Sequence, residues 1–146
     1  MIDLNVGMNR TGMDMDDFER VAGLARATLE RGIRLVGLHA YDGHLAMLPA
    51  EERTAAIRAA FERLLRLLES LHRAGIHIES VVTSGSITFV TAAHDDLLSG
   101  TGVHHQVSPG TVVYSDITTA EHLEAVRYQT AVHVLSRVIS APRKVR

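Results

Sequence analysis

Short apolar runs alternate along the chain with longer stretches in which apolar residues recur every three or four positions. Short runs that end at Gly or at polar residues predict β-strands, and the longer stretches predict amphipathic helices. The predicted strands cover residues 2–6, 33–38, 76–82 and 103–107. A strand–helix order repeated in this way predicts an α/β protein with a parallel sheet and right-handed crossovers.

Turn and cap residues set the limits of the first predicted helix. Gly12 breaks the chain after the first strand, and Gly32 is expected to end the helix. Asp14 or Asp16 is expected to cap its first turn, because a carboxylate there accepts from free backbone N–H groups.

The second helix is predicted to begin at Pro49 and to end at Gly75, and a short third helix is expected around residues 91–98. The core face of the second helix is predicted to consist of Ile57, Phe61, Leu64, Leu65, Leu68 and Leu71. Its outer face is charged and predicted to be solvated, and it carries Glu51, Glu52, Arg58, Glu62, Arg63, Arg66 and Glu69.

The strand spacing is typical both of a (β/α) barrel and of an open doubly wound sheet, and periodicity does not choose between them. Residues 112–114 are expected to continue extended, and residues 119–128 to form a loop or a poor helix. Residues 130–140 are rich in β-branched side chains and predict a strand of another sheet. The basic end, residues 142–146, is expected to fray.

Two predicted strand ends run into small residues. Ser84, Gly85 and Ser86 follow the third strand, and Gly110 and Thr111 follow the fourth. Small residues let backbone N–H groups converge on an anion, and hydroxyls add further donors. Because the carboxyl ends of parallel strands meet at one edge, the two turns predict one phosphate site. The alternative is a pair of ordinary strand-to-helix turns.

Composition narrows the class of protein. A chain of 146 residues with 46% hydrophobic residues suits one domain with a substantial core. A net charge of −2 without basic blocks gives no reason to expect nucleic acid. No apolar run approaches the roughly 20 residues that cross a bilayer, and no signal-peptide pattern is present, so no membrane partner and a cytoplasmic location are expected.

Two residue types limit the available chemistry. The absence of Cys excludes disulfides, thiolate nucleophiles and Cys-based zinc sites, and it fits a reducing compartment. The single lysine is Lys144, near the end of the sequence. A Schiff-base lysine within the predicted folded body therefore has no candidate.

Four segments together resemble one family. In order, residues 5–12 (NVGMNRTG), 37–44 (GLHAYDGH), 83–86 (TSGS) and 109–114 (PGTVVY) resemble the strand ends of the D-threonine aldolase/D-serine dehydratase group. These are alanine-racemase-type, fold-type III enzymes that use pyridoxal 5'-phosphate. The resemblance covers residues 2–116, and its weight comes from the order of the four segments.

The resemblance implies a pyridoxal-phosphate-binding (β/α)8 TIM barrel followed by a β-domain. It implies aldol cleavage or dehydration of D-β-hydroxy amino acids, with a D-amino acid as the small-molecule substrate. Residues 1–116 match about four parallel βα units, the C-terminal half of the barrel, and 117–146 match the connection and first strand of the β-domain. The family's Schiff-base lysine and the ligands of its divalent metal belong to regions that this sequence does not contain.

The same resemblance assigns roles to individual residues. Arg10 matches a family arginine beside the cofactor, where a guanidinium can bond the phenolate oxygen or a substrate carboxylate. Tyr41 matches the family position whose ring packs near the pyridine of the cofactor. His44 matches the position of a histidine that can form a hydrogen bond or relay a proton.

The phosphate loops are matched by Ser84, Gly85 and Ser86 and by Gly110 and Thr111. Three positions depart from the family. Asn5 stands where the family usually has Asp, Ser108 where an Arg or Gln usually faces the pyridine nitrogen, and Ile87 where the phosphate loop usually has a small residue.

Three interpretations follow. The chain is a fragment or half of a lyase that lacks its lysine, or it is a non-catalytic module that binds a phosphorylated ligand. As a half barrel it is expected to form a homo-oligomer or to pair with a complementing N-terminal half barrel, because its strand edges are open.

A metal site built from histidines is the third interpretation; its candidates are His39, His44, His94, His104 and His105. It is disfavoured because the zinc spacings HxH and HxxxH are missing, and because His104 and His105 would face opposite sides of a strand. A Ser hydrolase is weaker still, since residues 84–86 form no GxSxG elbow.

Overall fold

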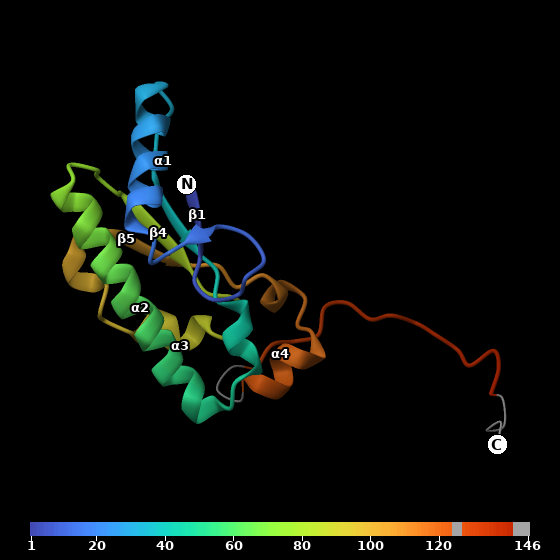
Figure 1. The fold of residues 1–146 in the computed structure, drawn as a ribbon. Coiled ribbons are helices and arrows are strands. Elements are labelled where there is room, and N and C mark those ends of the chain that lie inside the picture. Colours follow the sequence, from blue (N-terminus) through green and yellow to red (C-terminus); the bar gives the residue numbers. More distant parts are fainter. Residues whose placement is uncertain (124–126, 142–146) are drawn as a thin grey trace, which may run out of the picture. The chain divides into compact units, whose positions relative to one another are not determined.

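The computed structural model describes residues 1–123 and 127–141, and its elements alternate between strands and helices (Figure 1). The strands are β1 (Ile2–Asn5), β2 (Met13–Asp14), β3 (Gly37–Ala40), β4 (Ser80–Thr83) and β5 (His104–Val107). The α-helices are α1 (Phe18–Glu30), α2 (Ala50–Arg73), α3 (Phe89–His94) and α4 (Ile117–His122). Three 3-10 helices are η1 (Gly43–Met47), η2 (Ser99–Thr101) and η3 (Thr111–Val113).

The chain forms two compact units, Met1–Gly110 and Thr111–Arg146. The first unit holds the whole sheet and helices α1 to α3. The predicted division at residue 116, between barrel and connection, stays a prediction. In the described part of the chain no helix is long and apolar enough to cross a membrane.

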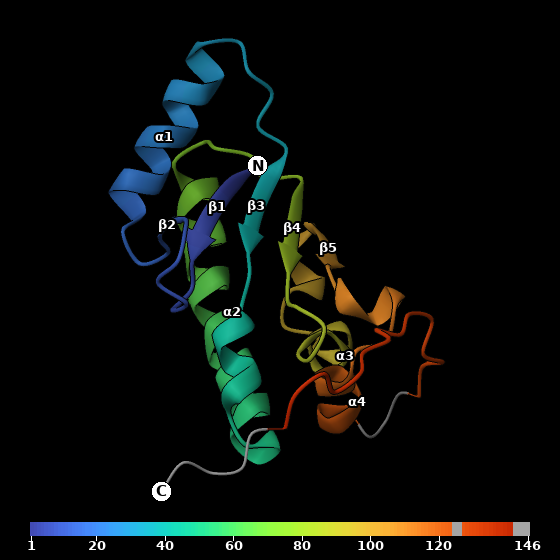
Figure 2. The ribbon, with the colours of Figure 1, turned by 90° about the vertical axis from the view of Figure 1, so that its right-hand side faces the viewer.

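The sheet is parallel throughout, with the strand order β2-β1-β3-β4-β5 (Figure 2). Apart from the two-residue β2, neighbours in space are consecutive along the chain. A doubly wound sheet reverses its strand order at a switch point, whereas a (β/α) barrel does not. The consecutive order of β1, β3, β4 and β5 is therefore that of a barrel segment, and the predicted α/β class is confirmed.

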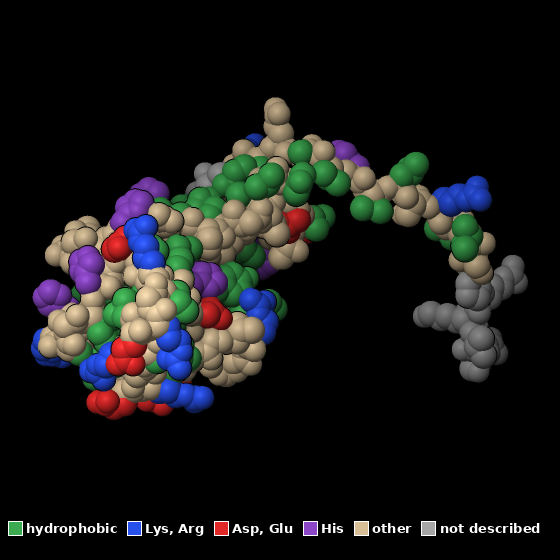
Figure 3. Space-filling model, turned by 90° about the horizontal axis from the view of Figure 1, so that it is seen from above, with side chains coloured by type: hydrophobic (Ala, Val, Ile, Leu, Met, Phe, Trp, Pro, Cys, Tyr) green, Lys and Arg blue, Asp and Glu red, His purple; other side chains and the backbone are tan. Residues whose placement is uncertain are grey.

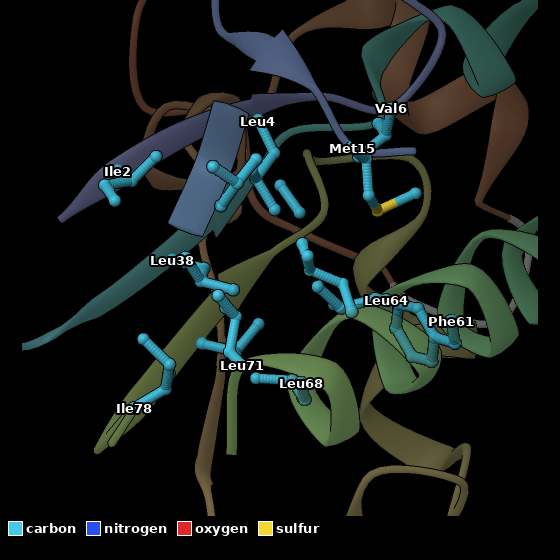
Figure 4. Packing of buried hydrophobic residues seen from close by; sticks show 14 of the residues in the cluster. Ile2, Leu4, Val6, Met15, Leu38, Phe61, Leu64, Leu68, Leu71 and Ile78 are labelled. Carbon is cyan, nitrogen blue, oxygen red and sulfur yellow. The ribbon is translucent and has the colours of Figure 1, made fainter. Parts of the chain in front are cut away.

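One face of the sheet packs against the helices. Leu4, Leu38 and Val81 point to this face and are almost completely buried. They meet the apolar face of α2, where Figure 4 shows Leu38 close to Leu71. Burying each of these side chains contributes about 1.5–3 kcal/mol relative to exposure. The opposite face carries polar side chains and holds none of the three helices.

Helix α2 largely follows its predicted pattern, with Leu67 buried in addition and Leu65 only partly buried. Its ends lie at Pro49 and at Ala74, directly before Gly75, which has a φ of 75°. Not all of its charges are free in solvent. Arg63 pairs with Asp16 at 2.6 Å, and Arg58 pairs with Asp95 at 3.2 Å.

The cap of α1 differs from the prediction. Asp17 is the cap and accepts from the backbone N–H of Arg20 at 3.1 Å. Asp14 lies in β2, and Asp16 is held by Arg63. The pair lowers the pKa of Asp16, chiefly through the hydrogen bond from Arg63.

Strands β3 and β4 start later than their apolar runs predict, at Gly37 and Ser80 instead of residues 33 and 76. The cause is the length of the neighbouring strand. Strand β1 begins at Ile2, which pairs with Leu38, so earlier residues have no strand beside them on that side. The apolar residues extend into the connections before β3 and β4, whereas strand pairing begins only where the neighbouring strand begins.

In the second unit, two expectations are wrong. Residues 111–113 form the 3-10 helix η3 where 112–114 were expected to stay extended. Residues 130–140 form no strand, and their large apolar side chains are exposed along an extended segment (Figure 3). Val and Ile favour strands only where a partner strand or packed face exists, and none is paired with this segment. The frayed end predicted for residues 142–146 lies outside the described residues.

Asp116 caps α4, accepting from the Thr119 backbone N–H at 2.9 Å and from its hydroxyl at 2.6 Å. These bonds lower the pKa of Asp116 to about 2, with the side-chain bond of Thr119 the largest cause. Residues 119–122 therefore belong to a helix, one of the two states expected for residues 119–128; residues 124–126 lie outside the described residues.

Candidate functional site

Most of the predicted site residues follow the carboxyl ends of parallel strands. Arg10 follows β1, Tyr41 and His44 follow β3, and Ser84 to Ser86 follow β4. Gly110 follows β5 as the last residue of the first unit, and Thr111 begins the second unit. The sheet thus directs the loops of the first unit to one edge, which is where barrel enzymes place their sites.

The ends of β4 and β5 are tied together. Ser108 donates its backbone N–H to the Thr83 carbonyl oxygen at 3.0 Å. Its hydroxyl donates to the carbonyl oxygen of Ser84 at 2.9 Å. Ser108, a departure from the family pattern, therefore joins the two loops predicted to hold a phosphate.

Ser84 has unusual backbone geometry. It is fully buried with a φ of 68°, in the left-handed region that residues with a side chain seldom adopt. Its hydroxyl donates to Thr83 Oγ1 at 3.2 Å. Backbone strain held by surrounding structure is common at ligand sites.

Gly85 lies beneath the ring of Tyr41. A Cβ atom at Gly85 would lie 2.8 Å from Cε2 of that ring, so only glycine fits without displacing the tyrosine. The Gly85 N–H donates to Thr88 Oγ1 at 3.0 Å, and the Thr88 hydroxyl donates to Asp42 Oδ1 at 2.7 Å. Asp42 and Tyr41 are consecutive, so the end of β3 contacts the loop after β4 through both side chains.

Asp42 and Thr88 were missing from the sequence prediction. Both are buried, and burial raises the pKa of Asp42. The signal available in the sequence was an acidic residue directly after a strand end, inside the YDGH segment. Nothing in the sequence indicated Thr88 as its partner, because 46 residues separate the two.

The end of β1 forms the other side of the site. The Arg10 guanidinium carbon lies 5.2 Å from the centre of the Tyr41 ring, a cation–π distance. A pocket of about 110 Å³ lies beside this pair and is also lined by Asp3, Asn5 and His39. Tyr41 therefore contacts both the arginine and the loop after β4.

Asn5 organises the loop that carries Arg10. Its Oδ1 accepts from the backbone N–H groups of Gly7 and Asn9, at 3.1 and 2.9 Å. Its Nδ2 donates to Asn9 Oδ1 at 2.9 Å. This position departs from the family's Asp, and the amide supplies a donor that a carboxylate lacks.

His44 packs against the loop after β1. A Cβ atom at Gly7 would lie 2.8 Å from its Nε2, and Gly7 has a φ of 131°. The His44 Nδ1 atom is buried and has no hydrogen-bond partner. A buried ring nitrogen without a partner is one that a bound group can satisfy.

Three other histidines proposed as metal ligands lie in strands, two on one face of the sheet and one on the other: His39, His104 and His105. Asp3 and His39 pair at 2.8 Å, and His104 bonds Gln106 at 2.9 Å. His105 lies on the helix side, bonding Thr83 at 2.8 Å and meeting Phe61 edge-on.

His104 and His105 therefore face opposite ways, as predicted. Burial lowers the pKa of His105. His94 bonds the Val90 carbonyl oxygen of its own helix at 2.7 Å. Within residues 1–123 and 127–141, no group of three His, Asp or Glu side chains is placed to hold a metal ion.

Comparison with known proteins identifies a family and several solved structures that are similar to this chain. Residues 1–118 match the family described as "Alanine racemase, N-terminal domain". The D-threonine aldolase structure from Filomicrobium marinum is similar with a TM-score of 0.73 and 25% identity, over 90% of this chain and 35% of that one. D-threo-3-hydroxyaspartate dehydratase from Delftia sp. HT23 matches with a TM-score of 0.67 and 23% identity, over 80% and 29% of the two chains.

An alanine-racemase-like protein from Idiomarina loihiensis has the same fold at 18% identity, with a TM-score of 0.57 over 84% and 30% of the two chains. No curated protein matches the chain. The chain spans about a third of the length of the structures it matches.

Proposed function

Because this chain belongs to the family of alanine racemase N-terminal domains, we propose that it supplies the phosphate-binding part of a pyridoxal 5'-phosphate site. The enzyme that this site serves is a lyase acting on D-β-hydroxy amino acids, by aldol cleavage or dehydration. The names of the aldolase and dehydratase with similar structures support this class of reaction.

One observation carries the proposal: the joined ends of β4 and β5. Ser108 bonds the carbonyl oxygen of Ser84, so small residues of both loops lie at one corner of the sheet. Gly85 keeps this corner narrow beneath Tyr41. Such corners bind phosphate esters because small residues let donors approach the oxygens closely.

The residues present fit one end of the cofactor. Tyr41 offers a ring above the loop after β4, Arg10 offers a cation beside that ring, and His44 has a buried nitrogen to satisfy. When bound, pyridoxal phosphate supplies an aldehyde that takes up an amino group and draws electrons from the α-carbon. Arg10 would bind and orient an acidic oxygen of the cofactor or the carboxylate of the substrate.

The other end of the cofactor requires a lysine. The single lysine, Lys144, lies outside the described residues. We therefore propose that the lysine comes from a complementing half barrel, which also carries the strands that close the sheet. The free edge of β5 supports this partner, since β4 is its only strand neighbour in the described chain.

Calorimetric titration tests the phosphate site with two probes. Pyridoxal 5'-phosphate is expected to bind saturably, and pyridoxal, which lacks the phosphate, at least tenfold more weakly. Inorganic phosphate is expected to compete with the first probe. Equal affinity for both probes would refute the site.

A matched pair of glycine variants tests whether the phosphate site lies at Gly85. Gly85→Ala places a methyl group against Tyr41 and is expected to weaken pyridoxal 5'-phosphate binding about tenfold. Gly100→Ala has open space around it and is the control, with unchanged binding expected. Equal affinities of the two variants would place the phosphate elsewhere.

A second candidate function is a non-catalytic module that assembles through β5. Strand β5 is the last strand in the described sheet and pairs only with β4, which favours pairing with another strand on its free side. Sedimentation distinguishes the two functions. Concentration-dependent association without phosphate binding favours the module, and a folded monomer that binds pyridoxal 5'-phosphate contradicts it.

A further inference from the structure

Asp42 is a buried carboxyl group outside the ion pairs of the described chain. It is 4% exposed. Val6 from the end of β1 and Phe61 and Leu64 from α2 line the small space next to it. His44 is the charged or titratable group that acts on it from η1. A buried carboxyl group in apolar surroundings is destabilising, and such groups are common where function requires them.

The bonds of Asp42 have a defined direction. An ionised carboxylate only accepts, so the single proton of the Thr88 hydroxyl points to Asp42 at 2.7 Å. The lone pairs of the same hydroxyl are then left for the Gly85 N–H at 3.0 Å. The Gly85 carbonyl oxygen lies 3.4 Å from the hydroxyl and is its alternative acceptor. If Asp42 stopped accepting, the hydroxyl could rotate to that oxygen and release the N–H.

The same loop is held on its other side by Tyr41, whose ring leaves no room for a Cβ atom at Gly85. The consecutive residues Tyr41 and Asp42 therefore restrain Gly85 from two directions. The loop that they contact also contains Ser84, whose φ is 68°.

We propose that Asp42 is a positioning residue for the phosphate loop: by orienting the Thr88 hydroxyl it fixes Gly85, and with it the conformation in which residues 84–86 meet a phosphate ester. This inference rests on the proposed function of the loop and adds how the end of β3 controls it. Protonation of Asp42 weakens the restraint, so affinity for the phosphate falls at acidic pH.

Amide hydrogen exchange of Gly85, measured by NMR on the whole chain, tests the restraint without any ligand. Thr88→Val keeps the shape of the side chain and removes both bonds, so Gly85 exchange is expected to accelerate about fivefold. Thr88→Ser keeps the hydroxyl and is expected to restore slow exchange. Thr91→Val, in helix α3, which begins directly after Thr88, is the control, with no change at Gly85 expected.

Asp42→Asn removes the titration. In the wild type, Gly85 exchange relative to a control amide is expected to speed up as the pH falls through the titration of Asp42, and in Asp42→Asn this dependence is expected to vanish. Asp96→Asn, at an exposed carboxylate, is expected to behave as the wild type. Pyridoxal 5'-phosphate affinity is expected to fall about fivefold in Thr88→Val, with pyridoxal unaffected.

The outcomes separate the two proposals. Wild-type exchange at Gly85 in Thr88→Val, or an unchanged pH dependence in Asp42→Asn, overturns the role of Asp42. Accelerated Gly85 exchange in Thr88→Val together with unchanged pyridoxal 5'-phosphate affinity also overturns it. Absence of pyridoxal 5'-phosphate binding by the wild type overturns the proposed function, while the exchange data still judge the restraint.

Discussion

The two sides of the candidate site differ in how their polar groups are satisfied. In the loop after β4 and at Asp42, which reaches this loop from the end of β3, buried polar groups bond one another: Ser84, Thr88 and Asp42 are almost completely buried, and each has a hydrogen-bond partner. On the side of Arg10 and of the Asp3–His39 pair, the charged groups are partly exposed. Asp3 and His39 are about two-fifths exposed, and Arg10 lies in an open pocket.

This difference indicates what each side does. A buried, internally bonded loop has one conformation before a ligand arrives, which suits recognition of a fixed group such as a phosphate. Exposed charges keep their solvation until another molecule covers them, which suits binding to the variable part of a ligand or to a partner. The first side is therefore preorganised, and the second is the side that the proposed partner would cover.

The largest effect is expected where the two sides share a strand pair. A methyl group at Gly37 of β3 would collide with the carbonyl oxygen of Ser80 on β4, so Gly37→Ala is expected to cost about 3 kcal/mol of unfolding free energy. Urea unfolding followed by far-UV circular dichroism measures it, since the chain has no Trp.

Gly23→Ala is the matched control for this variant. Gly23 lies within α1 with open space around it, so the substitution is expected to gain about 0.5–1 kcal/mol. If Gly37→Ala matched Gly23→Ala, the close contact of β3 with β4 would be wrong, and both sides of the site would lose their common support.

The preorganised side is expected to lose about 2 kcal/mol on Thr88→Val, because the variant removes the hydroxyl that bonds both the buried Asp42 carboxyl group and the buried Gly85 N–H. Urea unfolding of Thr88→Val and Thr91→Val measures the difference. A loss below that of the control would mean that the loop after β4 is not held by these bonds, and the contrast between the two sides would disappear.

The features that the sequence predicted depend on residues close together along the chain, whereas those that it missed depend on residues far apart. Strand ends and the helix face around Leu64 follow from local periodicity and turn residues, and these agree with the structure. The bond between Asp42 and Thr88 joins residues 46 positions apart, so no local pattern contains it. The strand predicted for residues 130–140 was wrong for the same reason, because strand formation depends on a partner strand that a local pattern cannot specify.

A smaller effect, with opposite signs at the buried Asp42 of the site and at the exposed Asp16 outside it, is expected on changing the pH. Burial raises the pKa of Asp42, so the folded state binds more protons than the unfolded state just above the ordinary pKa of 3.8. Its contribution to the free energy of unfolding therefore falls as the pH rises through this window. Asp16 has a lowered pKa because Arg63 donates to it, so its contribution is present above 3.8 and is lost as the pH falls.

Urea midpoints between pH 3 and 7 for the wild type, Asp42→Asn and Asp16→Asn measure the two contributions. Asp42→Asn is expected to gain stability relative to the wild type as the pH rises, and Asp16→Asn to lose it. High salt is expected to reduce the effect of the exposed Asp16 and to leave that of Asp42 nearly unchanged. The same sign for both variants would contradict the assigned burial of Asp42.

The smallest effect is expected on the exposed side, at the pair of Asp3 and His39. Because both side chains are in contact with solvent, His39→Gln is expected to cost less than about 0.5 kcal/mol, like Arg34→Gln in the exposed pair with Glu79. Urea unfolding compares the two variants. A cost near that of Thr88→Val would show that this face is already a finished, buried part of the fold. A negligible cost is what the proposed cover by a second set of strands requires, since the polar groups of this face would stay solvated until the proposed partner binds.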